Sequence, residues 1–123
     1  MTETENVENE TLQVIVGEQL SAVTFVMDYM RLQFDGPYLT LIHDPEVITP
    51  TGTYTRDVPG FRDTLCEHIT HIVTSARVKK NEVIEIAFDN GTIISISLRP
   101  EDYLFGPEAV IFHNKETEGW WVL

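Results

Sequence analysis

The chain has 123 residues, the size of one ordinary domain and too few for two separate cores. Its composition, 42% hydrophobic and 23% charged, is that of a globular protein and excludes a disordered or fibrous chain. The formal charge of −12 repels phosphate backbones, which argues against nucleic acid as a partner. The sequence therefore predicts a small, acidic, globular domain.

Cysteine content and hydropathy bear on the cellular compartment. Cys66 is the single cysteine, so no disulfide can form within the chain. The first residues have neither the basic nor the apolar region of a signal peptide, and no apolar run approaches the ~20 residues of a membrane-spanning helix. We therefore expect a cytoplasmic protein without a membrane partner.

Most of the chain has the pattern of β-strands. Residues 1–10 are polar and acidic and predict a disordered tail, which precedes a single β-rich domain over residues 11–123. In that domain, short runs rich in Val, Ile, Phe and Tyr alternate with turn residues, which is typical of strands. The predicted strands are Leu12–Val16, Leu20–Asp28, Met30–Asp35, Tyr38–His43, His71–Val78, Val83–Asp89, Thr92–Leu98, Ala109–His113 and Trp120–Leu123.

The middle of the chain interrupts this pattern. Residues 44–60 contain three prolines and predict either a long loop or a loop with a short edge strand at Val47-Ile48, because proline is poorly tolerated in central strands. After this stretch, Phe61, Leu65 and Ile69 recur at every fourth residue with polar residues between them. This spacing predicts a short helix that buries one apolar stripe.

The strongest local signal is a hairpin around Asp89-Asn90-Gly91. A two-residue Asn-Gly turn would set isoleucines opposite serines and mix the two faces of the hairpin. A three-residue loop with a left-handed glycine instead pairs Ile86 with Ile94 and Ile84 with Ile96. Because register follows the buried face, we predict the three-residue loop.

The two halves of the domain resemble each other over about residues 12–43 and 65–98. Each half carries Phe-Asp-Gly or Phe-Asp-Asn-Gly at the tip between its second and third strands, at residues 34–36 and 88–91. This indicates an internal repeat of a three-stranded meander. The predicted fold is mainly β (α+β), a bent sheet or partly open barrel of two duplicated meanders, with one short helix between them.

The paired meanders, the segment Gly106-Pro107-Glu108-Ala109 and the tryptophan-containing last strand carry a resemblance. In these features the chain is similar to a family of small bacterial β-rich proteins, a domain family of unknown function. The resemblance covers most of the chain beyond the acidic tail and consists of apolar spacing and turns. It implies no activity, cofactor or functional residue.

Cys66, His68 and His71 come closest to a metal site, because thiols and imidazoles are zinc ligands and two histidines three apart can share a helix face. A closed site needs a fourth ligand, and the apolar stripe of the helix places these side chains at its edges. We interpret both histidines as surface-leaning and the thiol as a half-buried small hydrophobe. We expect no metal and no cofactor.

Loops on rigid sheets often carry function, and two are candidates here. His43, Asp44 and Glu46 end a strand ahead of the proline-containing stretch, and Glu108 precedes another strand. However, His43 and Asp44 followed by proline also form an ordinary turn opening.

The last strand carries Trp120 and Trp121 on opposite faces, so only one of them can face the core of its own chain. The other ring either packs under the proline-containing loop or marks a partner contact. Because a terminal strand is expected at a sheet edge, we predict a homodimer that covers this ring and the edge together.

Two classes of function remain open. The first is a non-catalytic binding or interaction protein, for example an antitoxin-like neutraliser of a basic protein, which the acidic charge would attract. The second is a small-ligand-binding protein or enzyme with a pocket near the helix, lined by His43, Arg62, His68 and His71. A deep pocket with convergent polar groups would favour the second class, and a filled core with a flat acidic face the first.

Overall fold

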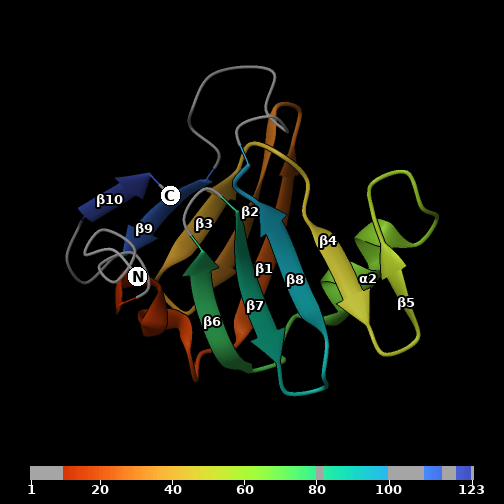
Figure 1. Cartoon of the computed structure of the whole chain (residues 1–123), viewed down its shortest axis with the longest axis horizontal. Coiled ribbons are helices and arrows are strands. Elements are labelled where there is room, and N and C mark those ends of the chain that lie inside the picture. The colour runs from red at the N-terminus through yellow and green to blue at the C-terminus, as the bar shows by residue number, and fades with distance from the viewer. Residues whose placement is uncertain (1–9, 80–81, 100–109, 115–118, 123) are drawn as a thin grey trace.

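A computed structural model describes residues 10–79, 82–99, 110–114 and 119–122. This part of the chain forms ten strands and two short helical segments, the 3₁₀ turn η1 (Gln13–Ile15) and helix α2 (Phe61–Glu67) (Figure 1). The strands are β1 (Leu20–Val26), β2 (Tyr29–Phe34), β3 (Tyr38–Leu41), β4 (Glu46–Thr49), β5 (Gly52–Tyr54), β6 (Val73–Lys79), β7 (Val83–Phe88), β8 (Ile93–Ser97), β9 (Val110–Asn114) and β10 (Gly119–Val122).

The strands form two antiparallel sheets of five strands each. The first sheet has the order β1-β2-β3-β9-β10 and the second the order β5-β4-β8-β7-β6, and the second lies in front of the first in Figure 1. The prediction of a mainly-β fold with one short helix between the meanders is confirmed. The strands do not close into a barrel, and the last strand lies at a sheet edge as predicted.

The core lies between the two sheets, because alternate residues of each strand point inward. Strand β7 shows the alternation most regularly, with every second residue buried. Both sheets contribute their inward residues to a single cluster. Its largest fully buried members are Phe34, Phe112, Leu12, Ile15, Leu20, Met30, Leu32, Leu39, Leu41, Leu65, Ile84 and Ile86.

Strands β1-β2-β3 and β6-β7-β8 are two three-stranded meanders with the same local irregularity. The register shifts after Leu20, which lies opposite Phe34, and again after Val73, which lies opposite Phe88. The two meanders thus share a bulge beside the phenylalanine that precedes the tip. A duplication of the sequence remains a prediction.

The hairpin between β7 and β8 has the predicted register. Ile86 pairs with Ile94 and Ile84 pairs with Ile96. The Phe88 N–H donates to the Thr92 carbonyl at 2.8 Å, which closes a three-residue loop. The last residue of that loop, a glycine, has a φ of +86°. The three-residue loop is therefore confirmed.

The predicted strand Leu12–Val16 is wrong. Residues 10–12 are helical and lead into η1. Leu12 and Ile15 are fully buried, whereas Val14 and Val16 are exposed. The buried positions therefore lie three apart, which is the period of a 3₁₀ turn and not of a strand. Glu10, predicted to belong to the tail, lies in this helical turn, and residues 1–9 lie outside the described part.

The strand predicted at Val47-Ile48 exists, but it lies inside the second sheet and not at its edge. Strand β4 pairs with β5 on one side and with β8 on the other. Pro45 and Pro50 flank β4 and leave its ladder intact, which explains how an interior strand fits between prolines.

Helix α2 contacts β1 of the first sheet and β4 of the second, and so covers one side of the sandwich (Figure 1). Phe61 and Leu65 are buried and Ile69 is partly buried against the core, so the predicted apolar stripe is confirmed. Gly60 precedes the helix with a φ of +92°, a conformation that favours glycine. No helix in the described ranges has the length and apolar character needed to cross a membrane.

Candidate functional site

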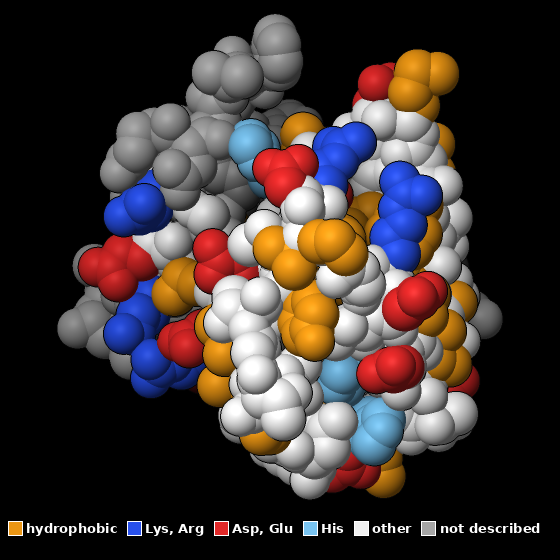
Figure 2. Space-filling view, turned by 90° about the vertical axis from the view of Figure 1, so that its right-hand side faces the viewer, with side chains coloured by type: hydrophobic (Ala, Val, Ile, Leu, Met, Phe, Trp, Pro, Cys, Tyr) orange, Lys and Arg blue, Asp and Glu red, His pale blue; other side chains and the backbone are white. Residues whose placement is uncertain are grey.

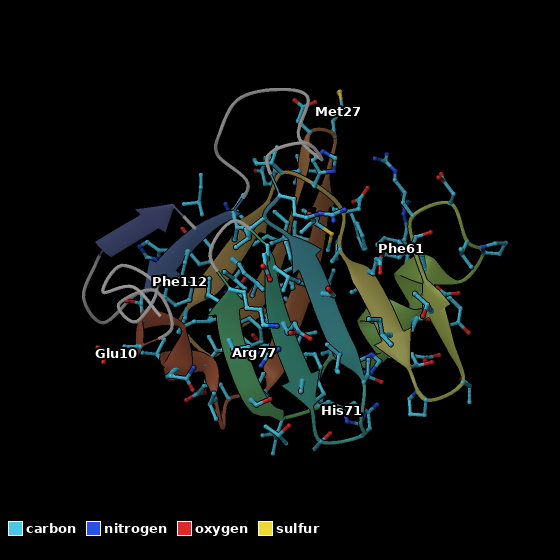
Figure 3. All side chains as sticks on the ribbon, viewed as in Figure 1. Glu10, Met27, Phe61, His71, Arg77 and Phe112 are labelled. Atoms are coloured by element: carbon cyan, nitrogen blue, oxygen red, sulfur yellow. The ribbon has the colours of Figure 1, made fainter. Side chains whose placement is uncertain are left out.

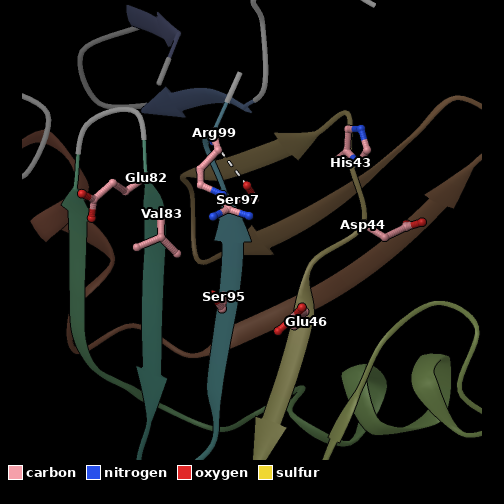
Figure 4. A pocket seen from close by; sticks show the side chains of 8 residues that line it. All are labelled: His43, Asp44, Glu46, Glu82, Val83, Ser95, Ser97 and Arg99. Carbon is pink, nitrogen blue, oxygen red and sulfur yellow. Dashed lines mark hydrogen bonds between the residues drawn. The ribbon is translucent and has the colours of Figure 1, made fainter. Parts of the chain in front are cut away.

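An open groove of about 790 Å³ lies on the outer face of the second sheet, where β8 ends and β4 and β7 begin (Figure 4). The residues lining it come from three chain segments that pair in the sheet. They are His43, Asp44, Glu46, Glu82, Val83, Ser95, Ser97 and Arg99. The groove therefore collects three of the residues singled out from the sequence, His43, Asp44 and Glu46, and adds five others.

Strand alternation determines which side chains enter the groove. Ile94 and Ile96 of β8 are buried in the core, so Ser95 and Ser97 point to the opposite face. Glu46 lies opposite Ser95 in the β4–β8 ladder, and Val83 lies opposite Ser97 in the β7–β8 ladder. The floor of the groove is thus made of one apolar and two hydroxyl side chains.

The charges at the groove are predominantly negative. Glu46 and Glu82 are exposed, and their carboxylates form no hydrogen bond or ion pair in the described part of the chain. Asp44 is paired with the Arg56 guanidinium at 3.1 Å. Arg99 is the one lining residue with a permanent positive charge, and its backbone N–H donates to Ser97 Oγ at 3.2 Å. The groove thus offers free carboxylates to a cation.

His68 and His71 lie at the other end of strands β7 and β8, beside the 89–91 loop. His68 is only 3% exposed, so its predicted surface position is wrong. Its Nδ1 lies 2.7 Å from the Thr64 carbonyl, which can only accept, so Nδ1 carries the proton. Its Nε2 then accepts from the Asn90 side-chain amide at 3.1 Å. The buried imidazole therefore joins the helix end to the hairpin loop.

His71 is hydrogen-bonded to the same loop. Its Nδ1–H donates to Asp89 Oδ1 at 2.6 Å, and the Ile72 backbone N–H donates to the other carboxylate oxygen at 3.3 Å. The hydrogen bond from His71 has the largest effect and lowers the pKa of Asp89; burial opposes it, and the hydrogen bond from the Ile72 backbone N–H lowers the pKa further. This pair connects the chain crossing before β6 to the β7–β8 tip.

The three side chains considered as metal ligands, Cys66, His68 and His71, do not form a metal site. His68 and His71 have ring centroids 5.5 Å apart, and both use Nδ1 for other contacts. Cys66 is exposed, so the half-buried position predicted for its thiol is wrong. Over the described ranges, no group of three His, Cys, Asp or Glu side chains has the arrangement to hold a metal ion.

Arg62 lies on the side of the sandwich covered by α2, with its guanidinium carbon 5.2 Å from the centre of the Phe25 ring. Two hollows adjoin this position, one of about 80 Å³ and an open one of about 370 Å³. Neither is lined by His43, His68 or His71. The four residues predicted to line a pocket near the helix are therefore divided among three places. Hydrophobic side chains on this side alternate with charges of both signs (Figure 2).

The remaining predicted residues belong to the C-terminal region. Glu108 lies outside the described residues. The backbones of Trp120 and Trp121 pair with His113 and Phe112 in the β9–β10 ladder, and their side chains lie outside the described part.

Sequence reasoning did not select Glu82 or Arg99 as site residues. Both lie near the open end of the hairpin, Glu82 immediately before β7 and Arg99 two residues after the end of β8. Charged residues at both open ends of a strongly predicted hairpin were the available signal, because antiparallel strands bring such residues together. No family model, curated protein or solved structure matches the chain, and the function is therefore inferred from its own residues.

Proposed function

We propose that the protein is a non-catalytic binding protein that holds a basic segment of a protein partner in the acidic groove. The observation that carries the proposal is the pair Glu46 and Glu82, two exposed carboxylates on either side of the groove floor (Figure 4). Val83 and Ser95 lie between them. A lysine or arginine side chain can lay its aliphatic stem along Val83 and direct its charged end to a carboxylate.

The charge of the whole chain acts in the same direction. A net charge of −12 attracts a basic partner over a long range and raises its rate of association. The open shape of the groove suits an extended polypeptide better than an enclosed small molecule, since small-ligand sites bury most of their ligand's surface. An antitoxin-like neutraliser of a basic protein is one protein of this kind.

Binding of an oligo-arginine peptide tests the proposal. Fluorescence anisotropy should detect binding that weakens between about 0.05 and 0.15 M salt, because the contacts are solvent-exposed ion pairs. The double variant Glu46→Gln, Glu82→Gln should weaken binding roughly two- to thirty-fold, given about 0.2–1 kcal/mol for each exposed pair.

A matched control separates the groove from the overall field. Glu10→Gln combined with Glu67→Gln makes the same change in net charge at two exposed residues outside the groove. We expect this control to retain most of the affinity. An equal loss in both double variants would mean that the peptide responds only to net charge, and the groove would then not be the binding site.

A further inference from the structure

The outer face of the first sheet carries a continuous stack of aromatic rings and one arginine. Tyr38 on β3 and His113 on β9 are ladder partners, and their rings stack with centroids 4.7 Å apart and planes 26° apart. The Arg31 guanidinium lies over the Tyr38 ring at 4.4 Å and over the Tyr29 ring at 5.9 Å. All four side chains are half-buried. This arrangement, the Arg31 face, is held by cation–π and stacking contacts.

Within the described residues, the strands of the Arg31 face carry no acidic side chain, although the chain contains 20 acidic residues. Strands β1, β2, β3, β9 and β10 include no Asp or Glu, and Asp28 and Asp35 lie in the turns at their ends. The second sheet differs, since Glu46 and Glu85 lie on its strands. The strand residues of the first sheet are therefore neutral or positive, on a strongly negative protein.

Arg31 has no acidic partner among the described residues, unlike Arg77 and Arg56. Arg77 donates to Glu85 at 2.9 Å and Arg56 to Asp44 at 3.1 Å. The Arg31 guanidinium forms no hydrogen bond or ion pair within the described residues, and its Nε is buried in its own chain without a hydrogen-bond partner. The positive charge of Arg31 is therefore not neutralised by an acidic side chain of the described residues.

The composition of the Arg31 face is that of a protein interface. Tyrosine and arginine are enriched at interface centres and binding hot spots, where aspartate and glutamate are depleted. The face is a sheet surface and not a cavity, which suits a protein better than a small molecule. With ~4.8 Å between neighbouring strands and ~3.3 Å per residue, a sheet of five strands of ~5 residues measures roughly 20 Å by 16 Å. This area is enough for the centre of an interface.

We infer that this face binds a second copy of the chain, so that the protein is a dimer held face to face through its first sheet. A copy approaching from another direction meets acidic groups, such as Glu46 and Glu82 at the groove or Asp63 and Glu67 on the helix. Contact through the Arg31 face places no acidic strand residue of one copy against the other, which favours this face for two molecules of charge −12. A two-fold axis uses this one patch twice.

The contacts within such a dimer follow from the residues beside Arg31. Thr24 and Gln33 are exposed, and they lie next to it in the β1–β2 ladder and along β2. In the dimer their polar side chains would face the second copy beside the aromatic stack. Salt screens the repulsion between the two negative bodies and should tighten the dimer. The homodimer predicted from the sequence thus acquires a surface, the face of the sheet and not its β10 edge.

Sedimentation equilibrium on the full chain tests this inference. From about 1 µM to about 100 µM protein, the wild type should move from monomer to dimer, and more completely at about 0.5 M than at about 0.1 M salt. Arg31→Glu places two carboxylates at the interface and should weaken dimerisation at least about tenfold. Arg77→Glu makes the same change of charge on the second sheet (Figure 3) and should weaken the dimer far less.

A second pair of variants tests the same inference in case Arg31→Glu does not fold. Thr24→Glu adds an acid on an exposed position of the Arg31 face without removing the stacked arginine, and should also weaken the dimer. Thr53→Glu on exposed β5 is its control and should not. A monomer at every concentration and salt, or equal effects of the Arg31 and Arg77 variants, would overturn the inference.

Discussion

Truncation of Leu65 to alanine tests whether helix α2 is part of the core. Leu65 is fully buried, and its helix contacts β1 and β4 at the side of the sandwich. The substitution removes three buried carbons, and such changes cost about 2–5 kcal/mol depending on how far the site collapses. A seven-residue helix at the side of a sandwich can shift inward. We therefore expect a loss of about 2–3 kcal/mol in the free energy of unfolding.

Urea unfolding followed by tryptophan fluorescence measures this loss, provided that the m-value stays constant. Thermal unfolding should show a decrease of roughly 4 °C in Tm for each kcal/mol in a domain of this size. Cys66→Ala, at the exposed neighbouring position, is the matched control and should change stability by less than about 0.5 kcal/mol. If Leu65→Ala costs no more than this control, the helix does not pack as described.

Three further predictions concern the loop between β7 and β8. Gly91→Ala should lower the free energy of unfolding by about 1–2 kcal/mol, because the φ of Gly91 is +86°. The control Gly52→Ala, at an open position without positive φ, should lower it by less than about 0.5 kcal/mol. Urea unfolding measures both. Asn90→Ala should cost about 1–3 kcal/mol, since it leaves a buried imidazole nitrogen and a backbone N–H without partners, and a neutral result would contradict this network. Because the pKa of Asp89 is lowered in the folded protein, this carboxylate stabilises the fold at pH values above 3.8, its ordinary pKa. The stabilisation is lost as the pH falls through the lower pKa of the folded state. Asp89→Asn should therefore reduce the acid dependence of Tm below pH 3.8, and an unchanged dependence would show that the pair with His71 contributes nothing.

Local sequence predicted the β7–β8 hairpin because its register depends on residues close together in the chain. Ile84 and Ile86 must meet Ile94 and Ile96 for one face to be buried, and only one loop length permits this. The apolar stripe of α2 was predictable for the same reason. In both elements, periodicity within a few residues determines which face is buried.

The segment 12–16 shows where local reasoning fails. Its apolar residues fit a strand, but the space between the sheets accepts Leu12 and Ile15 on one side of a turn. Gln13 donates from its side chain to the Ala76 carbonyl at 2.6 Å, a contact between residues 63 positions apart. Tertiary contacts of this kind override weak local preference, and no local pattern reveals them.

The groove was half predictable for a similar reason. His43, Asp44 and Glu46 are neighbours in sequence at the end of a strand, which marks them as a candidate loop site. Glu82 and Arg99 join them only because β4 pairs with β8, whose ladder sets Val47 against Ile94. That pairing is long-range and could not be derived from the pattern of either strand. His68 was misplaced in the same way, because its buried position depends on Asn90 in a distant loop.

The two proposed surfaces lie on opposite faces of the sandwich, so they can be occupied together. The groove is on the outer side of the second sheet and Arg31 on the outer side of the first. A face-to-face dimer would direct its two grooves away from each other, and a partner with two basic segments could engage both only with a linker that spans the dimer. Arg31→Glu should therefore leave oligo-arginine affinity per chain unchanged, and the variant with Glu46→Gln and Glu82→Gln should still dimerise. Because removing acids also relieves repulsion between copies, this variant should dimerise slightly more tightly than the wild type at low salt.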